Sequence, residues 1–143
     1  MKFLVLLIIL IGIASCSDEF RQEYETLKEF DKSNLRAKSW FPDCVGKDAF
    51  NFKSISGLDS LYAFSRFEYM EVGFYDSILS SSDYTKIDFS NLEKVIEKLS
   101  GAKPDWFIDL ETNNKGKLIY RKNDRWYIIK DSEDKTIYSL LTN

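Results

Sequence analysis

The chain has 143 residues, a length that suits one domain with a hydrophobic core of useful size. Its 20 Lys and Arg residues against 23 Asp and Glu residues give a net charge of −3, with both signs interspersed. No basic block suited to nucleic acid therefore stands out. The chain contains no histidine, which excludes Ser-His-Asp and Cys-His catalytic sites and zinc sites built on imidazole.

Residues 1–15 have the layout of a secretory signal peptide. Lys2 gives a basic start, an apolar run covers residues 3–13, and small residues follow it. A membrane-spanning helix needs roughly 20 apolar residues, and this run has about half that number. A membrane span is therefore the weaker interpretation.

The stretch Ile13-Ala14-Ser15-Cys16 resembles the lipobox of bacterial lipoproteins. In that family the cysteine thiol receives a diacylglycerol, a signal peptidase cuts before the cysteine, and the new amino group is often acylated too. The resemblance implies that lipidated Cys16 anchors the mature chain to a membrane, because two or three acyl chains hold a protein nearly permanently. An ordinary secreted precursor cut after Ser15 and an uncleaved anchor are the alternatives.

Ser17-Asp18-Glu19 resembles the acidic tag that follows the lipidated cysteine in surface-exposed lipoproteins of the Bacteroidota. The resemblance implies a cell-envelope location at the outer membrane or cell surface rather than at the inner membrane. The alternative is a solvated, acidic start of a helix. Whether the domain faces the periplasm or the exterior stays open.

The mature chain is expected to consist of a lipidated N-terminus with an amphipathic helix, residues 16–38, and a single α+β domain, residues 39–143. Phe20, Tyr24 and Leu27 stand at i, i+4 and i+7, the spacing of one helix face. We therefore predict a helix over residues 18–31 that packs on the domain.

Alternating apolar and polar residues predict strands over 49–55 and 61–69, and helical spacing follows over 74–79. The clearest local signal is Ser90-Asn91-Leu92-Glu93, which has the form of a capping box. It predicts a helix with Leu92 in its buried stripe and Gly101 in a left-handed C′ conformation.

The last forty or so residues predict an antiparallel meander, with turns at 113–116, 123–124 and 131–135. Its expected strands are 106–111, 117–122, 125–130 and 136–141. The sequence thus predicts an α+β fold: an antiparallel sheet of about five to seven strands with a C-terminal β-meander, and two to three helices mainly on one face.

Three loop carboxylates, Asp43, Asp48 and Asp59, are candidates for cation binding or acid-base catalysis. They lack the spacing of a calcium loop, and solvated caps are the favoured interpretation. Cys44 has no basic neighbour nearer than Lys47, so we expect a buried small hydrophobe rather than a reactive thiol. With no phosphate loop, nucleophile elbow or metal-ligand pair in the sequence, no cofactor and no metal are expected.

Surplus aromatic residues are the remaining feature. Trp40, Tyr120, Tyr127 and Tyr138 are candidate binding residues, because aromatic side chains are enriched at interface hot spots. The favoured alternative is that they fill the core of a small domain. The stretch from Trp40-Phe41-Pro42 to Ala49-Phe50-Asn51 resembles a pattern of small bacterial envelope proteins, and the resemblance carries no activity.

The sequence therefore favours a membrane-anchored lipoprotein whose domain binds an envelope protein partner, as an accessory or as an immunity or inhibitor protein. The alternative is a small envelope hydrolase or ligand-binding protein that uses the loop carboxylates in an aromatic-walled pocket. Binding is favoured over enzymatic activity, without excluding the latter.

Overall fold

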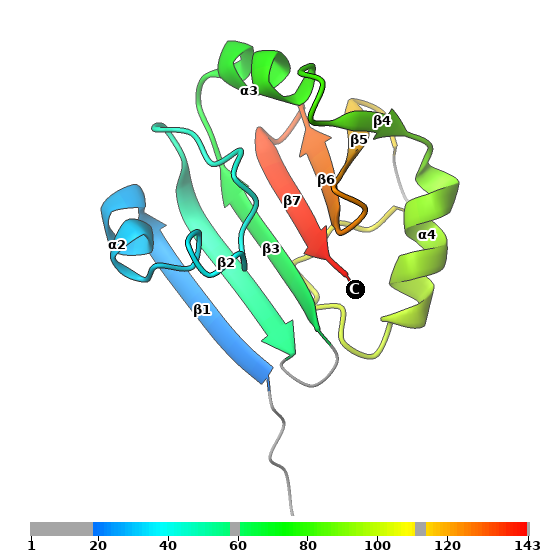
Figure 1. Cartoon of the computed structure of the whole chain (residues 1–143), viewed down its shortest axis with the longest axis horizontal. Helices are drawn as coiled ribbons and strands as arrows, with labels where there is room; N and C mark the ends of the chain where they lie inside the picture. Colours follow the sequence, from blue (N-terminus) through cyan, green and yellow to red (C-terminus); the bar gives the residue numbers. More distant parts are fainter. Residues whose placement is uncertain (1–18, 58–60, 111–113, 143) are drawn as a thin grey trace, which may run out of the picture.

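The computed structural model describes residues 19–57, 61–110 and 114–142, which form one seven-stranded antiparallel sheet with helices packed against it (Figure 1). The strands are β1 (Glu19–Thr26), β2 (Phe50–Gly57), β3 (Tyr62–Glu68), β4 (Thr85–Ile87), β5 (Lys117–Lys122), β6 (Trp126–Asp131) and β7 (Thr136–Leu141). The helices of the described residues are α2 (Leu27–Lys32), α3 (Val72–Leu79) and α4 (Phe89–Lys98). The predicted α+β fold with its C-terminal meander is confirmed.

The strand order is β1-β2-β3-β7-β6-β5-β4, so β7 lies at the centre between β3 and β6. Both faces of the sheet are covered. The first face packs against α2, the loop 33–49 and α3, and the second against α4 and the segment 99–110. Because side chains alternate along a strand, each central strand contributes to both cores. β3, for example, directs Phe67 to the first core and Phe64 to the second.

The first core is largely aromatic. Phe30 of α2 stacks on Phe52 of β2 with ring centroids 4.3 Å apart, and Phe41 of the loop meets Phe30 edge-on at 4.7 Å. These contacts hold α2 and the loop on the sheet, since aromatic pairs add about 0.5–1.5 kcal/mol beyond the area that they bury. Ser65 and Ser139 lie opposite each other on β3 and β7. Their hydroxyl groups form a hydrogen bond with each other in the middle of this face.

The tight turn predicted at Asn123-Asp124 is confirmed. Both residues have a φ of 52°, in the left-handed region, and the amide of Arg125 donates a hydrogen bond to the carbonyl of Lys122 across them. The turn sets the register in which Lys122 pairs with Trp126. It therefore fixes which faces Trp126 and Tyr127 occupy.

The helix predicted over residues 18–31 is wrong for its first two thirds. Residues Glu19–Thr26 form β1, which pairs with β2, and the helix α2 begins at Leu27. The spacing misled because Phe20 and Tyr24 are four residues apart, which places them on one side of a strand as well as on one side of a helix. Glu19 therefore begins a strand and not a helix.

The helix α4 is confirmed, but the capping box at its start is wrong. The helix begins at Phe89 after Asp88, and no side chain caps it. Because Ile87 still pairs with Ile119 of β5, the chain has one residue in which to turn from strand to helix. Gly101 does not have the left-handed conformation predicted for it. A capping box does occur at α2, where Thr26 and Glu29 bond each other's backbone amides.

The strand predicted over 106–111 is also wrong in its described part, which contains turns and no strand. Phe107 and Ile108 are consecutive and both enter the second core, so the segment does not alternate as a strand does. It covers the second face instead of extending the sheet. The short strand β4 was not predicted, since its three residues carry too little pattern.

Candidate interaction surfaces

Three of the four candidate aromatic residues are buried in the two cores. Tyr120 lies in the first core, and Tyr127 and Tyr138 lie in the second, on the opposite face of the sheet. Tyr127 also packs under the guanidinium of Arg121, which lies 4.0 Å from its ring centroid. The three tyrosines therefore do not form one exposed surface, and the interpretation as core residues describes them.

Trp40 is half-buried and lies beside a shallow hollow at one end of the sheet. The hollow has a volume of about 120 Å³ and is lined by Lys38, Ser39, Trp40, Leu61, Arg125 and Leu141. The loop 33–49 brings Trp40 next to residues that lie far away in the sequence. Of the four candidates, Trp40 therefore keeps access to the surface.

Asp43 joins the loop 33–49 to the opposite edge of the sheet. Its carboxylate accepts hydrogen bonds from the hydroxyl of Tyr84, at 2.6 Å, and from the ammonium of Lys122. Burial raises the pKa of Asp43, but the hydrogen bonds from Lys122 and Tyr84 outweigh this, so its pKa lies below the usual value. The ionised carboxylate of Asp43 therefore holds the loop 33–49 to this edge of the sheet.

Asp48 joins the same loop to the start of α3. Its Oδ2 accepts from the backbone amides of Met70, at 2.8 Å, and Glu71, at 2.6 Å, and its Oδ1 accepts from the hydroxyl of Tyr75. Burial raises the pKa of Asp48, but the hydrogen bonds from the amides of Glu71 and Met70, with that from Tyr75, contribute to a net downward shift. A general acid or base needs a pKa near the working pH, and Asp48 is held away from it.

Two of the predicted sites, Cys16 and Asp59, lie outside the described residues. Cys44 is fully buried and is not in a disulfide, as expected for a small hydrophobe. Burial raises the pKa of its thiol to about 12, which makes the thiolate inaccessible near neutral pH. Among residues 19–57, 61–110 and 114–142, no cluster of His, Cys, Asp and Glu side chains suits a metal ion.

An exposed apolar surface, which the sequence analysis missed, lies at the start of α3. Met70, Val72 and Phe74 have 63%, 37% and 42% of their surface exposed, and we call these three residues the α3 surface. Beside Met70 is a hollow of about 380 Å³, whose lining includes Leu27 and Phe50. The sequence contains a signal for this exposure. Tyr75 and Leu79, at i and i+4, form the buried stripe of α3, and Phe74 lies outside that stripe.

The ion pair between the buried Lys130 and the exposed Asp76 was also missed. Lys130 of β6 is almost completely buried beneath α3, and its ammonium bonds the carboxylate of Asp76. Lys130 shares the alternation of Trp126 and Ile128, which predicts an inward orientation. Because an unpaired buried charge is costly, this pair fixes α3 over the end of β6.

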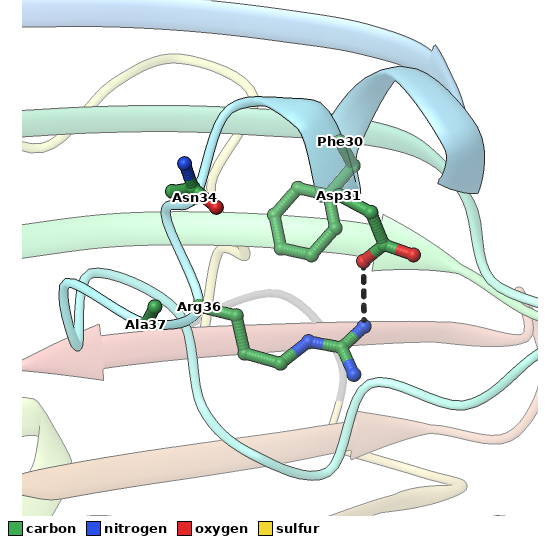
Figure 2. Close-up of a pocket in the computed structure, with 5 residues that line it drawn as sticks. All are labelled: Phe30, Asp31, Asn34, Arg36 and Ala37. Carbon is green, nitrogen blue, oxygen red and sulfur yellow. Dashed lines mark hydrogen bonds and ion pairs between the residues drawn. The ribbon is translucent and has the colours of Figure 1, made fainter.

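A further hollow, of about 270 Å³, follows α2 and is lined by Phe30, Asp31, Asn34, Arg36 and Ala37 (Figure 2). Asp31 and Arg36 point toward each other and form an ion pair of 3.3 Å. The Arg36 guanidinium also lies 5.6 Å from the ring centroid of Phe30. Both charges are exposed, so the pair contributes about 0–1 kcal/mol and serves the turn rather than a ligand.

None of the helices in the described part of the chain is long and apolar enough to cross a membrane. Residues 18–68 match the model of a family described as the YbbD head domain. No curated protein and no solved structure matches the chain. The match covers about a third of the chain, which includes β1, α2, the loop 33–49, β2 and β3. Residues 18–68, which include this edge of the sheet, are therefore similar in sequence to a YbbD head domain.

Proposed function

We propose that the chain is a lipid-anchored protein of the bacterial cell envelope whose domain binds a protein partner. The observation that carries the proposal is the α3 surface. Three exposed apolar side chains within five residues are unusual for a solvated helix start. Aromatic side chains and Met are enriched at protein interfaces.

Hydrogen bonds between the loop 33–49 and residues 70–75 hold the α3 surface in place. Asp48 bonds the backbone amides of Met70 and Glu71, and the hydroxyl of Tyr75 accepts a hydrogen bond of 3.0 Å from the amide of Gly46. A surface that is fixed before binding loses less conformational entropy when a partner arrives. This rigidity supports a docking role.

The position of the surface fits an anchor at Cys16. β1 begins at Glu19 at the bottom of Figure 1, whereas α3 lies across the top, beyond the other end of β3. Eight residues of β1 span about 26 Å. The α3 surface would thus point away from the membrane toward a partner, and lipidation of the chain at the outer membrane or cell surface remains part of the proposal.

The test is a pull-down of the lipidated protein from native membranes, comparing three forms. In the double variant Met70→Ser, Phe74→Ser, recovery of the partner should fall at least thirtyfold, which corresponds to about 2 kcal/mol at a hot spot. The matched control is Phe20→Ser, which removes an aromatic side chain of similar exposure at the other end of the sheet.

All three proteins are first compared by thermal melting, so that a loss of folding is recognised. Equal recovery of a partner with the double variant and the parent would contradict the α3 surface as the binding site. Loss of the partner in Phe20→Ser alone would move the site to the other end of the sheet.

A further inference from the structure

We propose that the end of the sheet at which β1 begins rests on the bilayer, where apolar side chains enter the interface and cations contact anionic headgroups. This inference rests on the proposed lipidation of Cys16. It adds a second membrane contact made by the folded domain itself, and we call this end the anchor end.

The tether is too short to let the anchor end leave the membrane. Three residue steps separate Cys16 from Glu19, and a fully extended chain spans at most about 3.6 Å per residue. Glu19 therefore stays within about 11 Å of the lipidated residue. Glu19 pairs with Gly57, and Gly57 pairs with Tyr62, so the neighbouring strand ends are held near the bilayer with it.

The anchor end exposes apolar side chains of the kind found at membrane interfaces. Phe20 has 54% of its surface exposed and Leu61 has 47%, and the half-buried Trp40 lies next to Leu61 around the same hollow. Phe20, Ser56, Ala63 and Leu141 form one cross-strand row on the first face. Aromatic and leucine side chains on one side of a protein insert into the boundary between headgroups and acyl chains.

Two cations lie beside the apolar side chains of this end and can contact anionic headgroups. Lys38 and Arg125 line the hollow with Trp40 and Leu61, and no carboxylate of the described residues forms an ion pair with either of them. Of the acids at this end that the structure describes, Glu19 pairs with Arg21 and accepts from Tyr62, and the exposed Asp124 lies 3.9 Å from Arg121.

The opposite end carries charges of both signs. The hollow beside Met70 is lined by Glu25, Lys47 and Asp48, and Glu71 precedes α3. Carboxylates are repelled by the negative surface potential of anionic lipids, whereas each Lys or Arg near such a surface improves binding about fivefold. The short tether to Cys16, together with Lys38 and Arg125, therefore selects the anchor end, and not the α3 surface, for the bilayer.

The test places an environment-sensitive fluorophore on Leu61→Cys and, as the matched control, on Met70→Cys, in the full lipidated protein. Both sites are exposed, Cys44 is buried with a raised thiol pKa, and Cys16 would be blocked by its lipid. The proteins are incorporated into vesicles of phosphatidylglycerol and phosphatidylcholine, and flotation measures anchoring separately.

Emission from position 61 should shift to the blue on incorporation and be quenched by nitroxide-labelled lipid, while emission from position 70 should not change. The double variant Lys38→Ala, Arg125→Ala should reduce the shift at position 61 without reducing flotation. Equal signals from positions 61 and 70 in floating protein would overturn the inference and leave the anchor intact. Protein that does not float would overturn both.

Discussion

At the scale of single residues, Asp48 carries the connection between the loop 33–49 and α3. Asp48→Ala removes the acceptor of two backbone amides, so the free energy of unfolding should fall by about 1–2 kcal/mol. Asp48→Asn keeps one acceptor oxygen and should lose less. Urea melts at neutral pH measure the difference, and an Asp48→Ala variant as stable as the parent would contradict the anchoring role.

Asp48 should also contribute to the loss of folding stability in acid. Its pKa in the folded protein is lowered below the unfolded value of about 3.9, so its stabilisation is complete above that pH and is lost as the pH falls through the folded pKa. Asp48→Asn should therefore flatten the decline of stability in acid below about pH 4. A decline as steep as in the parent would assign the effect to other carboxylates, such as Asp43.

At the scale of elements, strands with two apolar faces could be predicted from the sequence. In β3, a strand predicted from this alternation, Tyr62 and Phe64 enter the second core, whereas Ala63 and Phe67 enter the first. β1 could not be predicted in this way, because most of its side chains are exposed. Of its residues, only Tyr24 packs on the first core. Its structure comes from pairing with β2, which local spacing does not contain.

The candidate binding residues were harder to predict for a related reason. Their aromatic character was evident, but exposure depends on which segments cover each face. The segment 99–110 brings Phe107 to within 5.6 Å of the Tyr138 ring, and α3 covers part of the face that holds Tyr120. Both depend on contacts between residues far apart in the chain, so burial of these tyrosines could not be read from their own surroundings.

Helix capping provides a direct test of the element assignments. Thr26→Ala should cost about 1 kcal/mol, because Thr26 accepts from the amide of Glu29 at the start of α2. Ser90→Ala should change stability by less than about 0.5 kcal/mol, since Ser90 lies inside α4 and does not cap it. Leu92→Ala, in the second core, should cost about 2–5 kcal/mol.

Chemical denaturation of the three variants decides the assignment. A cost for Ser90→Ala equal to that for Thr26→Ala would mean that the side chain of Ser90 caps α4 after all. Leu92→Ala serves as the positive control for a buried position.

At the scale of the whole molecule, the anchor and the domain are separable predictions. Cys16→Ala should abolish incorporation of a palmitate analogue, because the thioether and the cleavage both depend on that thiol. Cys44→Ala is the matched control and should keep its label, since Cys44 is buried. Undiminished labelling of Cys16→Ala would contradict the lipoprotein assignment. The domain should fold in both variants.

The central place of β7 also governs how this protein is made. Residues 136–141 are the last strand along the sequence, yet they join β3 to β6. A chain delivered N-terminus first, by a ribosome or through a translocon, cannot close its sheet until these residues have emerged. Until then β1-β2-β3 and β4-β5-β6 each present an open edge, and such edges invite pairing with other chains. Synthesis thus exposes the nascent chain to aggregation until β7 has emerged, and a chaperone would be most useful in that interval.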